Sequence, residues 1–176
     1  MSRASHEHDG HWPFSSALRQ SSIESWTLAA ILRICDTVMS TQAPGGRILF
    51  VDDEQDILDV LAIEFSAAGF EVLAVASGGA AVKAAQRCRF DVAVTDFKMP
   101  GMDGLQLSRN LREIDPDLPI VMATGYAPDS VPLRPNEEGI DRVIRKPFSL
   151  EEVLGLVKRV IDESRARSGR RQRDGE

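Results

Sequence analysis

The chain has 176 residues, of which 43% are hydrophobic, so it can form one ordinary globular domain with additional segments but not two large domains. Its net charge is −6, and residues 47–162 alone carry 20 acidic and 13 basic side chains, which argues against nucleic-acid binding by that region. No apolar run approaches the roughly 20 residues that span a bilayer, and no secretory signal is recognisable. We therefore expect a cytoplasmic protein with no membrane contact and no nucleic-acid partner.

Only two cysteines, Cys35 and Cys88, are present, which makes a disulfide scaffold or a cysteine zinc site improbable. Residues 1–46 differ in composition from the rest, because they are rich in serine and histidine and contain a single amphipathic stretch between residues 23 and 38. We expect this segment to be an N-terminal appendage that is partly helical or disordered. Met39 offers a second start of translation, in which case the residues before it are dispensable for folding.

From Arg47 onward, short apolar runs alternate with stretches of helical periodicity. Five of the runs are too short for helices and predict strands. They cover residues 48–51, 72–76, 92–95, 119–123 and 142–145. Helical spacing is found near residues 57–65, 77–87, 105–114 and 149–161. This alternation is typical of an α/β fold, so residues 47–162 should form a doubly wound, five-stranded parallel sheet with helices on both faces.

Two parts of the chain are expected to be irregular. Within residues 125–141, Pro128, Pro132 and Pro135 interrupt the position of the fourth helix, which should therefore be short or irregular because an interior proline removes a hydrogen bond and clashes with the preceding turn. Residues 163–176 contain five arginines and no large apolar residue, which predicts a basic disordered tail.

Polar and charged side chains follow the predicted strands at the points where they end. Asp52 and Asp53 follow the first strand, Asp96 follows the third, Thr124 closes the fourth and Lys146 follows the fifth. Because the carboxyl ends of parallel strands meet at one edge of the sheet, these five residues should share one rim, where open α/β sheets form their binding sites.

The residue types on this rim indicate phosphoryl-transfer chemistry. Three neighbouring carboxylates repel one another unless a cation is present, and oxygen ligands favour Mg²⁺, or Mn²⁺, over zinc. The lysine supplies a second positive charge, and the threonine hydroxyl can donate a hydrogen bond to a phosphoryl oxygen. We therefore expect a carboxylate nucleophile that is surrounded by groups that position and neutralise a phosphoryl group.

Four segments on this rim form a recognisable pattern. They are Ile-Leu-Phe-Val-Asp-Asp-Glu at 48–54, Val-Thr-Asp-Phe-Lys-Met-Pro-Gly-Met-Asp-Gly at 94–104, Ala-Thr-Gly at 123–125 and Lys-Pro-Phe at 146–148. In this order and at this spacing, they resemble the receiver domain of two-component response regulators. The resemblance covers about two thirds of the chain.

The resemblance implies that Asp96 accepts a phosphoryl group from the phosphohistidine of a histidine kinase or a histidine phosphotransferase. It also implies that Asp53, Asp96 and the backbone carbonyl of Lys98 hold Mg²⁺, with Asp52 acting through a water molecule. Thr124 and Lys146 would bind the phosphoryl oxygens, and the Lys146–Pro147 peptide bond would be cis.

No output domain is recognisable after the receiver region. The chain is therefore expected to act as a stand-alone receiver that signals by docking onto an unidentified target protein. It would have no enzymatic activity beyond its own Mg²⁺-dependent phosphorylation and slow dephosphorylation.

The sequence departs from the receiver pattern where many receivers carry an aromatic switch residue, because Val143 occupies that position. Lys98 and Tyr126 stand where side chains overhang the phosphoryl group, or they are ordinary surface residues. Because a stiff valine has no ring to swing inward, we predict that phosphorylation instead orders or shifts residues 125–141.

Two other classes of protein remain open on sequence grounds. A haloacid-dehalogenase-like phosphohydrolase also uses an aspartate nucleophile on a parallel sheet, but it places a second aspartate two residues further on, where this chain has Lys98. A non-phosphorylated adaptor is the other alternative, although it would not need Asp53, Asp96, Thr124 and Lys146 to be intact.

Overall fold

The computed structural model of the chain describes residues 44–125 and 139–173. Residues 1–43 of the expected N-terminal appendage, the position of the irregular fourth helix and Tyr126 lie outside the described residues. The proposed readout at residues 125–141 lies largely outside them as well, and it stays a prediction.

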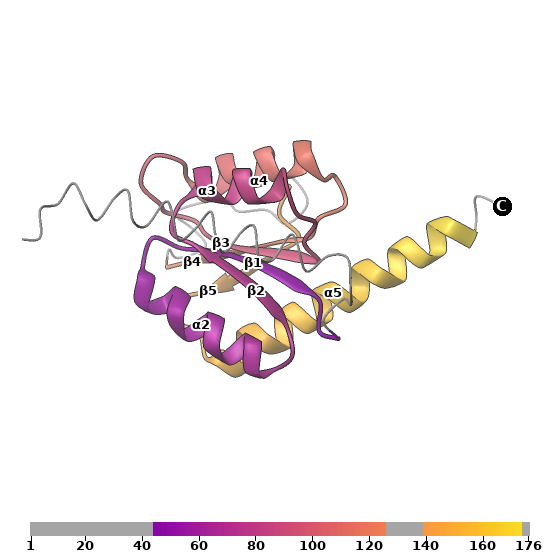
Figure 1. The fold of residues 1–176 in the computed structure, drawn as a ribbon, viewed down its shortest axis with the longest axis horizontal. Helices are drawn as coiled ribbons and strands as arrows, with labels where there is room; N and C mark the ends of the chain where they lie inside the picture. The colour runs from indigo at the N-terminus through magenta and orange to yellow at the C-terminus, as the bar shows by residue number, and fades with distance from the viewer. Residues whose placement is uncertain (1–43, 126–138, 174–176) are drawn as a thin grey trace, which may run out of the picture.

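The described residues form a five-stranded parallel sheet with the strand order β2-β1-β3-β4-β5. The strands are β1 (Arg47–Val51), β2 (Glu71–Val75), β3 (Val92–Asp96), β4 (Ile120–Thr124) and β5 (Arg142–Arg145). The helices are α2 (Gln55–Ala67), α3 (Gly78–Ala85), α4 (Gly104–Ile114) and α5 (Leu150–Arg173). Figure 1 shows α2 and α5 on one face of the sheet and α3 and α4 on the other. The expected flavodoxin-like, doubly wound fold is confirmed.

The core consists of two apolar layers, one on each face of the sheet. Successive side chains of a strand point to opposite faces, so Ile48 and Phe50 of β1 pack toward α2 and α5, while Leu49 and Val51 pack toward α3 and α4. All four of these side chains are almost fully buried. This double burial is typical of a central strand in a parallel sheet, and it explains why the strand consists of a continuous apolar run.

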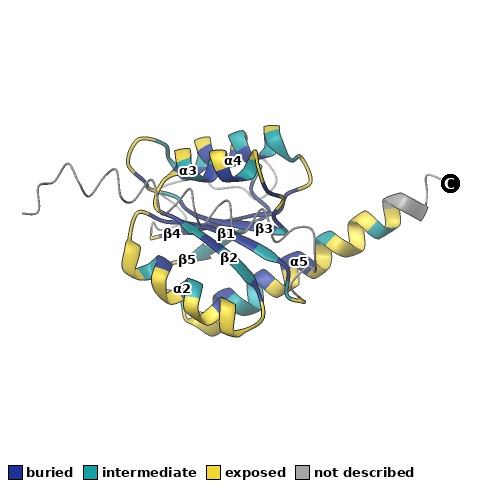
Figure 2. Ribbon diagram, in the orientation of Figure 1, coloured by how far each residue is buried: buried dark blue, intermediate teal, exposed yellow. Residues whose placement is uncertain are grey.

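The end of α5 corrects the expectation of a disordered tail for residues 163–173, because the helix continues to Arg173. Residues 174–176 lie outside the described part of the chain. Its last fully buried residue is Ile161, and the following turns project from the body of the domain (Figures 1 and 2). The Glu163 carboxylate accepts a 2.7 Å hydrogen bond from Arg142, and Arg165 lies 3.1 Å from the Asp91 carboxylate. These ion pairs, together with the good helix propensity of arginine, account for helical structure in a stretch that has no apolar face.

Cys88 also differs from expectation. Its side chain is buried after the end of α3, and it is disulfide-bonded, with its partner outside the described residues. Cysteine spacing along the sequence does not report which cysteines the fold brings together.

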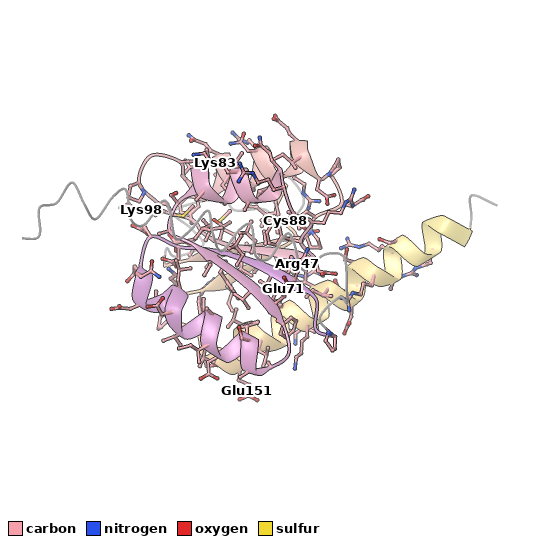
Figure 3. All side chains as sticks on the ribbon, viewed as in Figure 1. Arg47, Glu71, Lys83, Cys88, Lys98 and Glu151 are labelled. Carbon is pink, nitrogen blue, oxygen red and sulfur yellow. The ribbon has the colours of Figure 1, made fainter. Side chains whose placement is uncertain are left out.

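The edge of the sheet at which the strands begin is held by ion pairs. Arg47 donates two hydrogen bonds to the Glu71 carboxylate, at 2.8 and 3.0 Å, and so joins the starts of β1 and β2. Figure 3 shows Arg47 and Glu71 at one end of the sheet and Lys98 at the other.

Where β4 and β5 begin, at the same edge, the buried carboxylate of Asp141 accepts a hydrogen bond from the Ile120 backbone N–H at 2.8 Å and forms an ion pair with Arg112. Arg112 also donates to the carbonyl oxygens of Pro116, at 2.6 Å, and Gly139, at 3.1 Å. One arginine therefore joins the end of α4 to the entries of β4 and β5.

Replacing Asp141 with alanine should lower the free energy of unfolding by about 2 to 4 kcal/mol, because it leaves the Ile120 N–H unpaired and the Arg112 charge without its partner. Urea denaturation measures this loss. Glu163→Ala removes a carboxylate from an ion pair whose partners are about half exposed, and it should cost less than about 1 kcal/mol. Equal losses in the two variants would contradict the importance given to Asp141.

Candidate functional site

The candidate site lies where four of the parallel strands end. Val51 of β1 lies opposite Thr95 of β3, and Thr124 of β4 lies opposite Arg145 of β5. Each of the charged residues that follow these strands therefore emerges at the same edge. The Lys146 backbone N–H donates to the Thr124 carbonyl at 2.8 Å, which continues the pairing of β4 and β5 up to the site.

The ammonium group of Lys146 lies between two buried carboxylates. Its Nζ is 2.6 Å from Asp52 Oδ2 and 2.7 Å from Asp96 Oδ1, whereas Glu54 is more distant at 3.7 Å. Asp52 and Asp96 are only 5% and 8% exposed, so without a cation their charges would repel strongly. Lys146 supplies that cation from within the chain.

The ionisation of Lys146 reflects this arrangement. Burial by itself would lower the pKa of the ammonium group, but the hydrogen bonds and negative charges of Asp52 and Asp96 outweigh burial and raise the pKa above 10.5. Lys146 is therefore a fixed positive charge at neutral pH.

Backbone groups hold the remaining oxygens of the two carboxylates. Asp96 Oδ2 accepts a 2.7 Å hydrogen bond from the Lys98 N–H, and Asp52 Oδ1 accepts one of 3.0 Å from the Glu54 N–H. Each carboxylate is thus oriented by a local turn on one oxygen and by Lys146 on the other. This leaves little rotational freedom for Asp96, which is the condition for a positioned nucleophile.

The turn after Asp96 depends on a glycine that sequence reasoning did not single out. The Gly104 N–H donates to the Phe97 carbonyl at 2.9 Å, which closes the loop between β3 and α4. A Cβ at Gly104 would collide with the Asp96 carbonyl oxygen and come within 2.7 Å of Met122 Sδ. Gly104 stands at the end of one of the pattern segments, so the position was visible in the sequence although its packing role was not.

The structure gathers most of the predicted site residues. Asp52, Asp96 and Thr124 are buried at the rim and Lys146 is half-buried, whereas Asp53 is exposed beside them. The Lys98 side chain is exposed as well, while its backbone N–H takes part in the site. The Lys146–Pro147 bond is cis, as the resemblance implies.

The oxygen atoms on the rim are ligands of the type that a divalent cation such as Mg²⁺ needs. Among residues 44–125 and 139–173, no three histidine, cysteine, aspartate or glutamate side chains converge as a ready metal site. Mg²⁺, however, typically takes one or two carboxylates and retains several waters. The carboxylates of Asp52, Asp53 and Asp96 and the carbonyl oxygen of Lys98 provide donors of that type, and the position between Asp52 and Asp96 already holds a positive charge in Lys146.

An apolar groove opens beside Lys146. It has a volume of about 570 Å³ and is formed mainly by Ile57, Val60 and Leu61 of α2 together with Phe148 and Leu150 after β5. Val60 is 48% exposed and Leu150 is 38% exposed. Large exposed apolar side chains that surround a groove are typical of a protein-binding surface. None of the helices in the described part of the chain is both long and apolar enough to cross a membrane.

The fold and this rim define an α/β domain that carries an acidic pocket at its strand ends. Residues 48–158 match the family model of the response regulator receiver domain, and the chain therefore belongs to the response regulator receiver family. The family match favours the receiver over the phosphohydrolase alternative.

Similar proteins agree with this assignment. The response regulator receiver protein CpdR of Brucella abortus is 34% identical over 117 residues, which are 65% of this chain and 96% of CpdR. The transcriptional regulatory protein PrrA of Mycobacterium tuberculosis is 32% identical over 123 residues, which are 70% of this chain but only 53% of PrrA. The chain therefore spans nearly all of one relative and about half of the other.

Solved structures give the same result. A CheY-like receiver domain protein from Methanospirillum hungatei superposes with a TM-score of 0.65 and 30% identity, covering 69% of this chain and 97% of that chain. The response regulator TrrA of Thermotoga maritima, in complex with Mg²⁺ and BeF, superposes with a TM-score of 0.57 and 29% identity, covering 65% of this chain and 97% of TrrA.

Gly104→Ala should destabilise the domain by about 1 to 3 kcal/mol, because the added methyl group has no room beside the Asp96 backbone. Gly79→Ala is the matched control, since a Cβ there meets nothing within 4 Å in helix α3. That variant should be neutral or slightly more stable, as alanine is the better helix former. Chemical denaturation compares the two, and similar stabilities would contradict the packing role of Gly104.

Proposed function

We propose that this receiver accepts a phosphoryl group on Asp96 from the phosphohistidine of a histidine kinase or a histidine phosphotransferase, and signals by docking onto a target protein. The observation that supports this function best is the Lys146 ammonium held between the buried carboxylates of Asp52 and Asp96. Such a pocket contains an oriented carboxylate nucleophile and a fixed positive charge within reach of an incoming phosphoryl group.

In the proposed reaction, a carboxylate oxygen of Asp96 attacks the phosphorus atom of the phosphohistidine. An O–P bond forms as the P–N bond breaks, and the electron pair of that bond leaves with the imidazole ring. The product on this chain is an aspartyl phosphate. Lys146 neutralises the added negative charge, and the Thr124 hydroxyl donates a hydrogen bond to a phosphoryl oxygen.

Mg²⁺, when bound, would supply additional positive charge for the phosphoryl oxygens. Asp53, Asp96 and the backbone carbonyl of Lys98 would hold it, with Asp52 acting through a water molecule. Mn²⁺ has the same ligand preference and could replace it. The chain's own residues orient the nucleophile and hold the phosphoryl group.

The apolar groove beside Lys146 supports docking of a protein phosphodonor. Its walls, from α2 and from the segment after β5, can receive the apolar face of a partner helix. This placement would bring a phosphohistidine on that helix close to the rim that carries Asp96. We infer that the exchange takes place in the cytoplasm, where such a donor would meet the receiver.

Incubation with acetyl phosphate, or with a phosphorylated histidine kinase, in the presence of Mg²⁺ should add about 80 Da to the protein, as a carboxylate nucleophile predicts. Intact-mass spectrometry measures the addition. Asp96→Asn should abolish it, and EDTA should suppress it by removing the metal. The exposed Asp117→Asn is the matched control and should leave phosphorylation unchanged.

Phosphorylation that persists in Asp96→Asn would refute the assignment of the acceptor. Undiminished phosphorylation in EDTA would refute the role of the metal. Steady release of phosphate from a range of phosphate esters would instead support the phosphohydrolase alternative, and no phosphorylation from any donor would support the adaptor.

A further inference from the structure

Phe148 lies two residues after Lys146, in the segment between β5 and α5, and its side chain is half-buried. It lines the apolar groove beside Lys146, and it also lines a second, much smaller cavity of about 10 Å³ beneath the candidate site. Leu61 of α2 is the one other described residue that lines both spaces. These two side chains therefore form a partition between the open groove and the small cavity.

The small cavity lies directly against the acidic pair of the site. Asp52 and Asp96 form its polar wall, and its other walls are apolar side chains. These belong to Phe50, Val51, Leu58, Leu61, Val94, Ala123 and Phe148. One water molecule needs a cavity of roughly 10 to 15 Å³ and two or more polar partners. At about 10 Å³, the cavity is at the lower limit of that size, so water has almost no room beneath the two carboxylates.

Exclusion of water from this side supports the geometry of the site. An ion pair is stronger where water is excluded, and Lys146 Nζ lies 2.6 Å from Asp52 and 2.7 Å from Asp96. Water that entered the cavity would compete with the ammonium group for the carboxylate oxygens and would allow Asp96 to rotate. A nucleophile that is held in one orientation and has lost its water reacts faster than a hydrated and mobile one.

The ring of Phe148 is the larger of the two side chains in the partition. Leu61 is held in the core of the domain and is only 4% exposed, whereas Phe148 lies at the boundary between this core and the groove. Truncation of Phe148 to alanine would remove most of the partition. The cavity beneath the carboxylates would then join a groove of about 570 Å³ that is open to solvent.

We propose that Phe148 is a positioning residue for the acceptor site: its ring closes the floor of the site against the groove, so that Asp52 and Asp96 face Lys146 without competing water. The closure itself stands on the cavity and the groove, while its effect on the reaction rests on the proposed function.

Leu156 of α5 distinguishes this role from packing alone. It is half-buried like Phe148 and packs in the same apolar layer. It lines a cavity between β5 and α5, however, and not the one beneath the carboxylates. Loss of packing should therefore affect variants of both residues, whereas entry of water beneath the carboxylates should be confined to variants of Phe148.

Crystal structures of the unaltered chain, Phe148→Ala and Leu156→Ala test the closure. Phe148→Ala should show ordered water in the cavity, within hydrogen-bond distance of a carboxylate oxygen of Asp52 or Asp96. The unaltered chain and Leu156→Ala should show none there. A dry cavity in Phe148→Ala, or water already present in the unaltered chain, would overturn the proposal. Phe148→Val takes the place of Phe148→Ala if the alanine variant does not fold, with the same expected result.

The rate of phosphorylation by acetyl phosphate with Mg²⁺ tests the effect on the reaction, because this small donor needs no docking in the groove. The rate should decrease in the order phenylalanine, leucine, valine and alanine at position 148. It should be roughly tenfold lower in Phe148→Ala, as expected for a nucleophile that is less well oriented, and should stay within about twofold in Leu156→Ala.

Equal rates in Phe148→Leu, Phe148→Val and the unaltered chain would overturn the positioning role, as would an equal loss of rate in Leu156→Ala. If the unaltered chain accepts no phosphoryl group at all, the proposed function is wrong. The crystal structures still decide in that case whether Phe148 keeps water from the two carboxylates.

Discussion

The repulsion between two buried carboxylates is the constraint that the rest of the site depends on. Asp52 and Asp96 are almost completely withdrawn from water, and each places an oxygen within 2.7 Å of the Lys146 ammonium. Two negative charges in so little water are costly unless a cation lies between them. The two carboxylates can therefore stay buried side by side because Lys146 lies between them. A cation or phosphoryl group that binds here adds its charge to the three charges already present.

The parallel sheet places these three groups together although they are far apart in the sequence. Asp52 follows β1, Asp96 ends β3 and Lys146 follows β5, and the strand register brings these ends to a common edge. The strands β1, β3 and β4 are buried along almost their whole length between the two helical layers, which keeps this edge rigid. Gly104 then allows the loop after Asp96 to pack closely against the acceptor backbone. The opposite edge, held by Arg47 and Arg112, contributes stability rather than chemistry.

Much of this arrangement could be predicted from the sequence, because continuous apolar runs mark buried strands and the residues after them must share one rim. The sequence could not show features that depend on which residues the fold brings close together. The ion pair of Lys146 with Asp52, the exposure of Asp53 and the disulfide at Cys88 depend on how the strands and loops are placed. The helix beyond Ile161 was missed because its ion pairs to Asp91 and other carboxylates join residues distant in sequence.

The ionisation of Lys146 tests this account most directly. Because the folded-state pKa is raised above 10.5, the ammonium contributes stability that is fully present below pH 10.5 and is lost as the pH rises through the folded value. An NMR titration of the Lys146 side chain should give a pKa above 10.5, and Asp52→Asn and Asp96→Asn should each lower it. A pKa at or below 10.5 that neither substitution changes would contradict the bridging role of Lys146.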